Sequence, residues 1–159
     1  MSTGNSVETL KNRYLTFPLG EDILAIEIQN IVEIIGMQTM TKVPDAPEYI
    51  EGVINLRGQP VPIVNVRNKF NLEPIEYDSK TSIIVLNIED ISVGLTVDAV
   101  HDVVSIKDSE MSPYTKKGRY DDFEYIRAIA MVKEETILFV DCQKLLGIDS
   151  TGKGDVAGA

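Results

Sequence analysis

Apolar and polar residues alternate in short runs along most of the chain, and the runs are separated by glycine, proline or a few charged residues. Alternation with a period of two is typical of β-strands that bury one face, and β-branched residues dominate many of these runs. The pattern predicts an all-β or mainly β protein with a few short helices. The runs that predict strands are residues 13–20, 21–28, 52–56, 61–66, 81–90, 91–97, 99–106, 125–132 and 136–142.

The segments between these runs carry helix and loop signals. Residues 28–36, IQNIVEIIG, place apolar side chains at helical spacing but are rich in β-branched residues, so helix and strand both remain open there. Residues 65–72 are predicted as a short helix, and residues 143–147 as a helical turn that ends at a glycine. A long polar loop is expected over residues 107–124. Mobile or disordered ends are expected at residues 1–11 and 149–159.

The two halves of the chain resemble each other. Residues 49–72 fall on residues 125–148 at a shift of 76 without a gap, and residues 22–35 fall on residues 91–104 at a shift of 69. Any two apolar hairpins look alike, but here the order of elements also agrees. An internal repeat with about five strands in each copy predicts two small barrels or sandwiches. The expected subdomains are roughly residues 12–80 and 81–148, and strand exchange between them remains open.

Composition narrows the possible functions. The chain has 159 residues, 43% of them apolar, and a formal net charge of −10. An acidic chain without a basic block argues against binding to nucleic acid or to anionic lipid. A single cysteine, Cys142, excludes a disulfide framework and fits a reducing, cytoplasmic location. The first residues do not resemble a signal peptide, and no apolar run approaches the roughly 20 residues that span a bilayer.

The sequence lacks the motifs of common catalytic sites. The single histidine, His101, lies in an apolar strand-like run with no Gly-x-Ser-x-Gly turn elsewhere, and neither metal-ligand clusters nor phosphate-binding loops occur. Cys142 is interpreted as a small core residue. We therefore expect no enzyme, no cofactor and no metal. A small β-barrel enzyme or small-molecule binder is the weaker alternative, since catalytic sites are assembled from distant residues.

One hairpin presents an arginine at its tip. In the stretch EYIEGVINLRGQPVPIVNVRNKF, Arg57 lies between two apolar runs, and Gly52 and Gly58 are predicted as turn glycines. An arginine on a rigid tip loses little backbone entropy on binding, and arginine is enriched in interface hot spots. The alternative is that a solvated tip accepts any polar residue.

The same stretch closely resembles the signature hairpin of the CheW family, the coupling proteins of bacterial chemotaxis. GVINLRG, the following Pro62 and the R-x-K-F pattern ending at Phe70 match that signature. SIIVLNIEDISVGLTVDAVHDVVSI and FVDCQKLLG resemble the family's later segments, so the resemblance covers about residues 12–148. It implies two SH3-like five-stranded β-barrel subdomains, without catalysis or a cofactor.

The resemblance also implies partners and a site. Family members bridge the cytoplasmic tip of chemoreceptors and the regulatory domain of the histidine kinase CheA. They are cytoplasmic and are recruited to membrane-associated receptor arrays. Arg57 matches the arginine that the family uses in coupling, and Ile31 and Glu33 match positions linked to a receptor-binding groove. Val97 and Val100 are expected to line the same groove. The alternative within the family is an adaptor of another chemosensory pathway, such as twitching motility or development.

Overall fold

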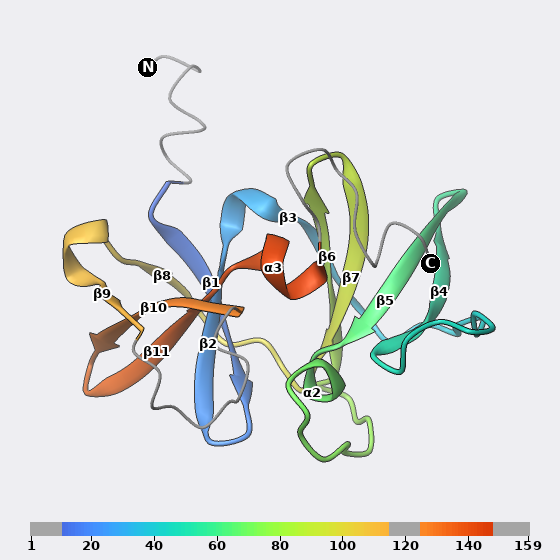
Figure 1. Cartoon of the computed structure of the whole chain (residues 1–159), viewed down its shortest axis with the longest axis horizontal. Coiled ribbons are helices and arrows are strands. Elements are labelled where there is room, and N and C mark those ends of the chain that lie inside the picture. The colour runs from blue at the N-terminus through green and yellow to red at the C-terminus, as the bar shows by residue number, and fades with distance from the viewer. Residues whose placement is uncertain (1–10, 115–124, 148–159) are drawn as a thin grey trace.

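The computed structural model describes residues 11–114 and 125–147 of the chain (Figure 1). Apart from Lys11, the segments predicted to be mobile or disordered lie outside these residues, as does most of the polar loop expected before residue 125. The described part consists mainly of β-strands in two sheets, with four short helical segments. This confirms the mainly β fold with short helices. The helical segments are η2 (Ile28–Asn30), α2 (Val66–Lys69), η3 (Asp108–Glu110) and α3 (Cys142–Leu146).

The strands form a six-stranded and a five-stranded sheet. The first sheet runs in the order β8 (Val103–Ser105), β1 (Arg13–Leu19), β2 (Asp22–Glu27), β11 (Glu135–Val140), β10 (Ile126–Val132) and β9 (Ser112–Pro113). The second runs in the order β3 (Ile31–Gly36), β6 (Ser82–Ile88), β7 (Ile91–Val97), β5 (Gln59–Asn65) and β4 (Ile50–Leu56). The two-residue strand β9 lies in the segment predicted as a loop and gives the first sheet its sixth strand. The ambiguous segment 28–36 divides into the short 3-10 helix η2 and the strand β3.

Each sheet combines strands from both halves of the sequence. β1 and β2 pair with β8 and β11, whereas β6 and β7 from the second half join β3, β4 and β5. The exchanged strands are attached through two parallel pairs, β2 with β11 and β7 with β5. The topology therefore contains the strand exchange that the sequence left open, and a boundary near residue 80 does not separate the two sheets.

The internal repeat is present in the register of the strands. In the first sheet Phe139 lies opposite Ala25, and in the second Ile63 lies opposite Gly94, which are the repeat-related positions. The bulge between Ile50 and Gly52 in β4 also recurs between the equivalent residues of β10. The two sheets are therefore built from the same arrangement of five strands, and only β9 is additional.

The apolar residues form one core between the sheets and a smaller one against each sheet. The central core contains Phe17 and Leu24 of the first sheet and Leu86 and Leu95 of the second. Residues of α2 and α3 also belong to it, and Figure 1 shows both helices at the junction between the sheets. Burial of this continuous apolar surface holds the two subdomains together.

Both helices lie where the sequence predicts them, but α2 ends at Lys69 rather than at residue 72, and α3 begins at Cys142, a residue that was predicted as the end of the preceding strand. Asn65 accepts a hydrogen bond from the backbone N of Asn68 at 2.9 Å, and Asp141 accepts one from that of Lys144 at 3.1 Å, so each caps its helix. Gly147 follows α3 with φ +68°, the left-handed conformation that ends many helices. These caps fix the end of β5 to α2 and the end of β11 to α3.

Candidate functional site

The hairpin tip between β4 and β5 presents Arg57 to solvent. Arg57 and Gly58 both have positive φ, +51° and +83°, which is the geometry of a tight two-residue hairpin turn. The backbone N of Gly58 donates to Oδ1 of Asn55 at 2.8 Å and braces the turn. The prediction that Gly58 adopts positive φ agrees with the structure. The side chain of Arg57 is 67% exposed and is therefore available to a partner.

Gly52 does not lie in a turn, so its prediction as a turn glycine is wrong. It lies inside β4 at the bulge, where a Cβ atom would be 2.9 Å from both Cβ of Met40 and the carbonyl oxygen of Thr41. Thr41 is held there by backbone hydrogen bonds with Val53 of 2.8 and 2.9 Å. The position requires glycine because the chain that follows β3 crosses closely over β4.

This crossing brings Arg57 and Glu33 together. β3 and β4 are the opposite edges of the second sheet, and the Thr41–Val53 bridge closes the sheet into a barrel. The guanidinium of Arg57 then meets both carboxylate oxygens of Glu33, with Nη1 to Oε1 at 3.5 Å and Nη2 bonded to Oε2. The hydrogen bond to Glu33 raises the pKa of Arg57. Two residues that the family resemblance singled out therefore form one ion pair.

Apolar side chains lie on the strand beside this pair. Val32 and Ile34, on either side of Glu33, are 54% and 43% exposed. A bulge lies between Ile31 and Glu33, the exposure of the side chains alternates along the strand, and Ile31 packs on the central core. Glu33 is half-buried between these two exposed residues and points to the opposite face of the strand, so the edge strand β3 carries apolar side chains on one face and the charged pair on the other. We call Val32, Glu33, Ile34 and Arg57 the β3 edge site.

Val97 and Val100 do not join this site. Ile31 pairs with Leu86 at one end of β6, whereas Val97 pairs with Ser82 at the other end, four residues or about 13 Å away. Val97 is only 3% exposed and lies in the central core, so in this structure it cannot touch a partner directly. Val100 is half-buried against the same core, after β7. The expectation that Val97 lines a groove is corrected, because β7 is covered on both faces.

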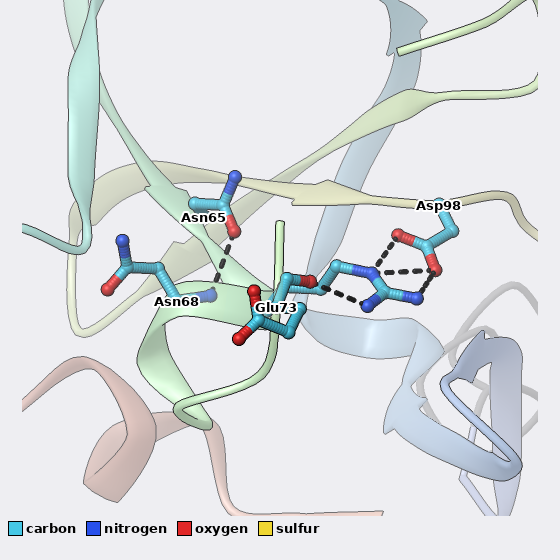
Figure 2. Close-up of polar contacts among 5 residues, drawn as sticks. Asn65, Asn68, Glu73 and Asp98 are labelled. Carbon is cyan, nitrogen blue, oxygen red and sulfur yellow. Dashed lines mark hydrogen bonds and ion pairs between the residues drawn. The ribbon is translucent and has the colours of Figure 1, made fainter. Parts of the chain in front are cut away.

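Arg67 of the R-x-K-F pattern holds the connection between the sheets. Its Nε and Nη2 donate to the carboxylate of Asp98 at 2.8–3.1 Å, and Nη1 donates to the carbonyl oxygen of Glu73 at 2.8 Å. Asp98 follows β7, where the chain leaves the second sheet for the first. Figure 2 shows Asp98 and Glu73 around this guanidinium, and the capping bond from Asn68 to Asn65. Arg67 thus fixes α2 to the crossover segment.

A polar cavity of about 310 Å³ lies between the two sheets beside α3. Its walls include Glu27, Glu89, Arg127 and Gln143, and its floor includes the buried Cys142. Arg127 is 3.5 Å from Glu27, and Gln143 donates to Glu89 at 2.9 Å, so the polar groups of the walls pair with one another. Burial raises the pKa of the Cys142 thiol to about 12, so this thiol is not a nucleophile near neutral pH.

Other chemistry is sparse within residues 11–114 and 125–147. In these ranges no three His, Cys, Asp or Glu side chains gather in a way that could hold a metal ion. His101 is exposed, and its backbone N donates to the carbonyl oxygen of Thr16 at 2.8 Å. No helix in the described part of the chain is long and apolar enough to cross a membrane.

Similarity to known proteins decides the family. The family model described as CheW-like domain matches residues 13–149. The chain belongs to this family. Chemotaxis protein CheW of Klebsiella aerogenes is 36% identical over 139 residues, which cover 87% of this chain and 84% of that protein. Chemotaxis protein CheW of Bacillus subtilis is 30% identical over 139 residues, which cover 87% of this chain and 89% of that protein.

A solved structure shares the fold. The scaffolding protein TtCheW from Thermoanaerobacter tengcongensis superposes with a TM-score of 0.79 at 28% identity, over 90% of this chain and 91% of that one. The likeness extends over both sheets. The CheW-family resemblance and the fold expected from the sequence are therefore confirmed.

Sequence reasoning missed three residues of this CheW-family chain that the structure singles out. Val32 and Ile34 were not distinguished from core residues. The signal for them was that the apolar residues of IVEIIG occupy both faces of a strand, of which only one can face the core. Asp98 was missed because nothing in the sequence connects it to Arg67, 31 residues earlier.

Proposed function

We propose that this protein is a chemotaxis adaptor that couples chemoreceptors to the histidine kinase CheA by binding both. It acts without catalysis, in the cytoplasm, and is recruited to receptor arrays at the membrane. Family membership and the names of its relatives, which are chemotaxis and scaffolding proteins, support this function. Weak individual contacts suffice, because an array supplies many of them at once.

The observation that carries the proposal is the β3 edge site. An exposed ion pair contributes little to folding stability, so the Arg57–Glu33 pair is poorly explained as a structural device. It does hold the guanidinium in one orientation on a rigid tip, at the edge strand that also exposes Val32 and Ile34. Pre-ordering the arginine lowers the conformational entropy that is lost on binding. We assign this site to the kinase regulatory domain.

The receptor is assigned to the other apolar surface. Ile31, at the start of β3, and Val100, on the segment that follows β7, are each half-buried against the central core. Apolar side chains at the surface of this core suit the apolar side of a helix, which is a recurring mode of recognition. A receptor helix at the junction and a kinase domain at the β3 edge would then bind simultaneously.

The test is quantitative binding of the full chain to a receptor cytoplasmic fragment and, separately, to the CheA regulatory domain. Arg57→Ala is compared with Lys133→Ala, because Lys133 occupies the repeat-related position at the β10–β11 tip and also has positive φ. We expect Arg57→Ala to weaken kinase binding by about tenfold or more, as at a hot spot, and to retain receptor binding. Lys133→Ala should retain both.

Two results would overturn the assignment. If the wild-type chain binds neither partner, the adaptor function with these partners is wrong. If Arg57→Ala remains folded by circular dichroism and binds the kinase domain as the wild type does, the β3 edge site is not the kinase contact. Binding to a receptor fragment and to a CheA homologue of another pathway, but not to this CheA, would place the chain in that pathway.

A further inference from the structure

Lys69 at the end of α2 lies between two tyrosines that the internal repeat relates. Its Nζ is 3.7 Å from the ring centroid of Tyr49 and 5.3 Å from that of Tyr125. Tyr49 directly precedes β4 of the second sheet, and Tyr125 directly precedes β10 of the first. Both distances are within the range of cation–π attraction, which extends to about 6 Å. One ammonium group therefore interacts with both subdomains.

The two tyrosines are fixed in equivalent ways. The carbonyl oxygen of Tyr49 accepts from the backbone N of Asn65, and that of Tyr125 accepts from Asp141, each at 2.8 Å. Asn65 and Asp141 are the capping residues of α2 and α3, so each ring is held near the start of its own subdomain's helix. A movement of one sheet relative to the other therefore moves one ring relative to the other.

Only one copy of the repeat carries the lysine. The position equivalent to Lys69 in α3 is Leu145, which is buried in the central core. Phe70, which follows Lys69 in the sequence, packs edge-on against the ring of Tyr125, with ring centroids 5.5 Å apart and ring planes at 85°. The contacts of α2 with the first sheet therefore include two oriented ring interactions, in contrast to the non-directional packing of the central core.

We propose that Lys69, shared between Tyr49 and Tyr125, sets the relative orientation of the two sheets. Close apolar packing holds the sheets together, and the cation–π geometry adds a directional contact that changes with any rotation of one sheet against the other. The second part of the inference rests on the proposed function. If the β3 edge binds the kinase and the junction binds the receptor, this orientation is what receptor binding at the junction changes, and Lys69 is a positioning residue for signal transmission.

The first experiment measures orientation in the adaptor alone. Spin labels on Gln59→Cys and Glu135→Cys report one distance between the sheets, since these exposed residues occupy repeat-related positions at the starts of β5 and β11. The natural Cys142 is buried and does not interfere. Lys69→Met removes the charge and keeps the side-chain length, whereas Lys69→Arg keeps a cation that stacks on aromatic rings. Lys80→Met, at an exposed lysine outside the sheets, is the control.

We expect Lys69→Met to increase the population of distances outside the wild-type distribution by about two- to fivefold, the factor that an exposed cation–π contact corresponds to. Lys69→Arg should restore the wild-type distribution, and Lys80→Met should not change it. An unchanged distribution in folded Lys69→Met would overturn the inference, and so would an equal change in Lys80→Met.

The second experiment measures receptor control of kinase activity in the reconstituted complex. We expect Lys69→Met to reduce this control while its affinity for each separate partner stays within twofold of the wild type. If a variant with an altered distance distribution still shows the wild-type level of receptor control over kinase activity, the transmission role is refuted. If the wild-type chain fails to couple receptor and kinase at all, the proposed function fails, and the distance measurement still decides the role of Lys69 in orientation.

Discussion

Replacing Gly52 by alanine tests how the second barrel closes. The added Cβ would lie 2.9 Å from Cβ of Met40 and 2.9 Å from the carbonyl oxygen of Thr41, closer than such contacts occur. Neither neighbour is the flexible end of a side chain. The segment at Thr41 therefore has to move away from β4, which lengthens or breaks its two hydrogen bonds with Val53.

The magnitude follows from these two bonds. A backbone hydrogen bond contributes about 0.5–1.5 kcal/mol net, so losing both costs about 1–3 kcal/mol. The lower backbone entropy of unfolded alanine offsets roughly 0.4–1 kcal/mol of this loss. We expect Gly52→Ala to lower the free energy of unfolding by about 1–2 kcal/mol, or the melting temperature by about 3–6 °C for a chain of this length.

Urea unfolding followed by circular dichroism measures the free energy, and amide hydrogen exchange at Thr41 and Val53 localises the change. Gly36→Ala is the matched control, because Gly36 also lies in a strand of this sheet but a Cβ atom added there would meet nothing within 4 Å. That variant should be equally stable or up to about 1 kcal/mol more stable. If Gly52→Ala matches the wild type in stability and in exchange protection at both amides, the close approach of Thr41 to β4 does not require glycine at this position.

Three further predictions concern other parts of the molecule. Arg67→Met should destabilise the fold by about 1–3 kcal/mol, and Arg67→Lys should not restore it, because lysine cannot reproduce the forked contact with Asp98; urea unfolding of both variants checks this. Gly58→Ala should lose roughly 1 kcal/mol in the same assay, since φ of +83° is strained for alanine. Because burial raises the pKa of Cys142 from 9.0 to about 12, the thiol stabilises the fold fully below pH 9, and this contribution should decline between pH 9 and 12. Unfolding curves across this range should show a steeper decline for the wild type than for Cys142→Ala, and parallel curves would contradict the assignment.

Local features could be predicted from the sequence because nearby residues determine them. The hairpin tip at Arg57 and Gly58 and the end of α3 at Gly147 depend on residue identity over a few positions, whereas the repeat was visible because two halves of the chain carry the same pattern. The extent of β7 also follows from its apolar run. The failure of β7 to expose Val97 has a physical reason, because β7 lies in the middle of its sheet and is buried on both faces, so alternation carries no information there.

Long-range features could not be predicted in the same way. An apolar pattern indicates which face of a strand is buried, but it does not specify the neighbouring strand, so the exchange of β1 and β2 for β6 and β7 stayed open. The pairing of Arg57 with Glu33 depends on the crossing of Thr41 over β4, and the pairing of Arg67 with Asp98 depends on where β7 ends. The family resemblance named Arg57 and Glu33 but gave no reason for them to meet.

The exchange of strands also has a consequence for how the chain folds. Neither sheet can be completed by one half of the sequence, because β2 pairs with β11 and β5 pairs with β7, and each pair joins strands from different halves. The parallel pair of β2 and β11 joins residues more than a hundred positions apart, which gives the fold a high contact order and slow folding. On the ribosome, β1 and β2 emerge first and remain without their partner until β11 has been synthesised. Folding of the first sheet is therefore expected to be largely post-translational, and a fragment ending near residue 80 should not fold.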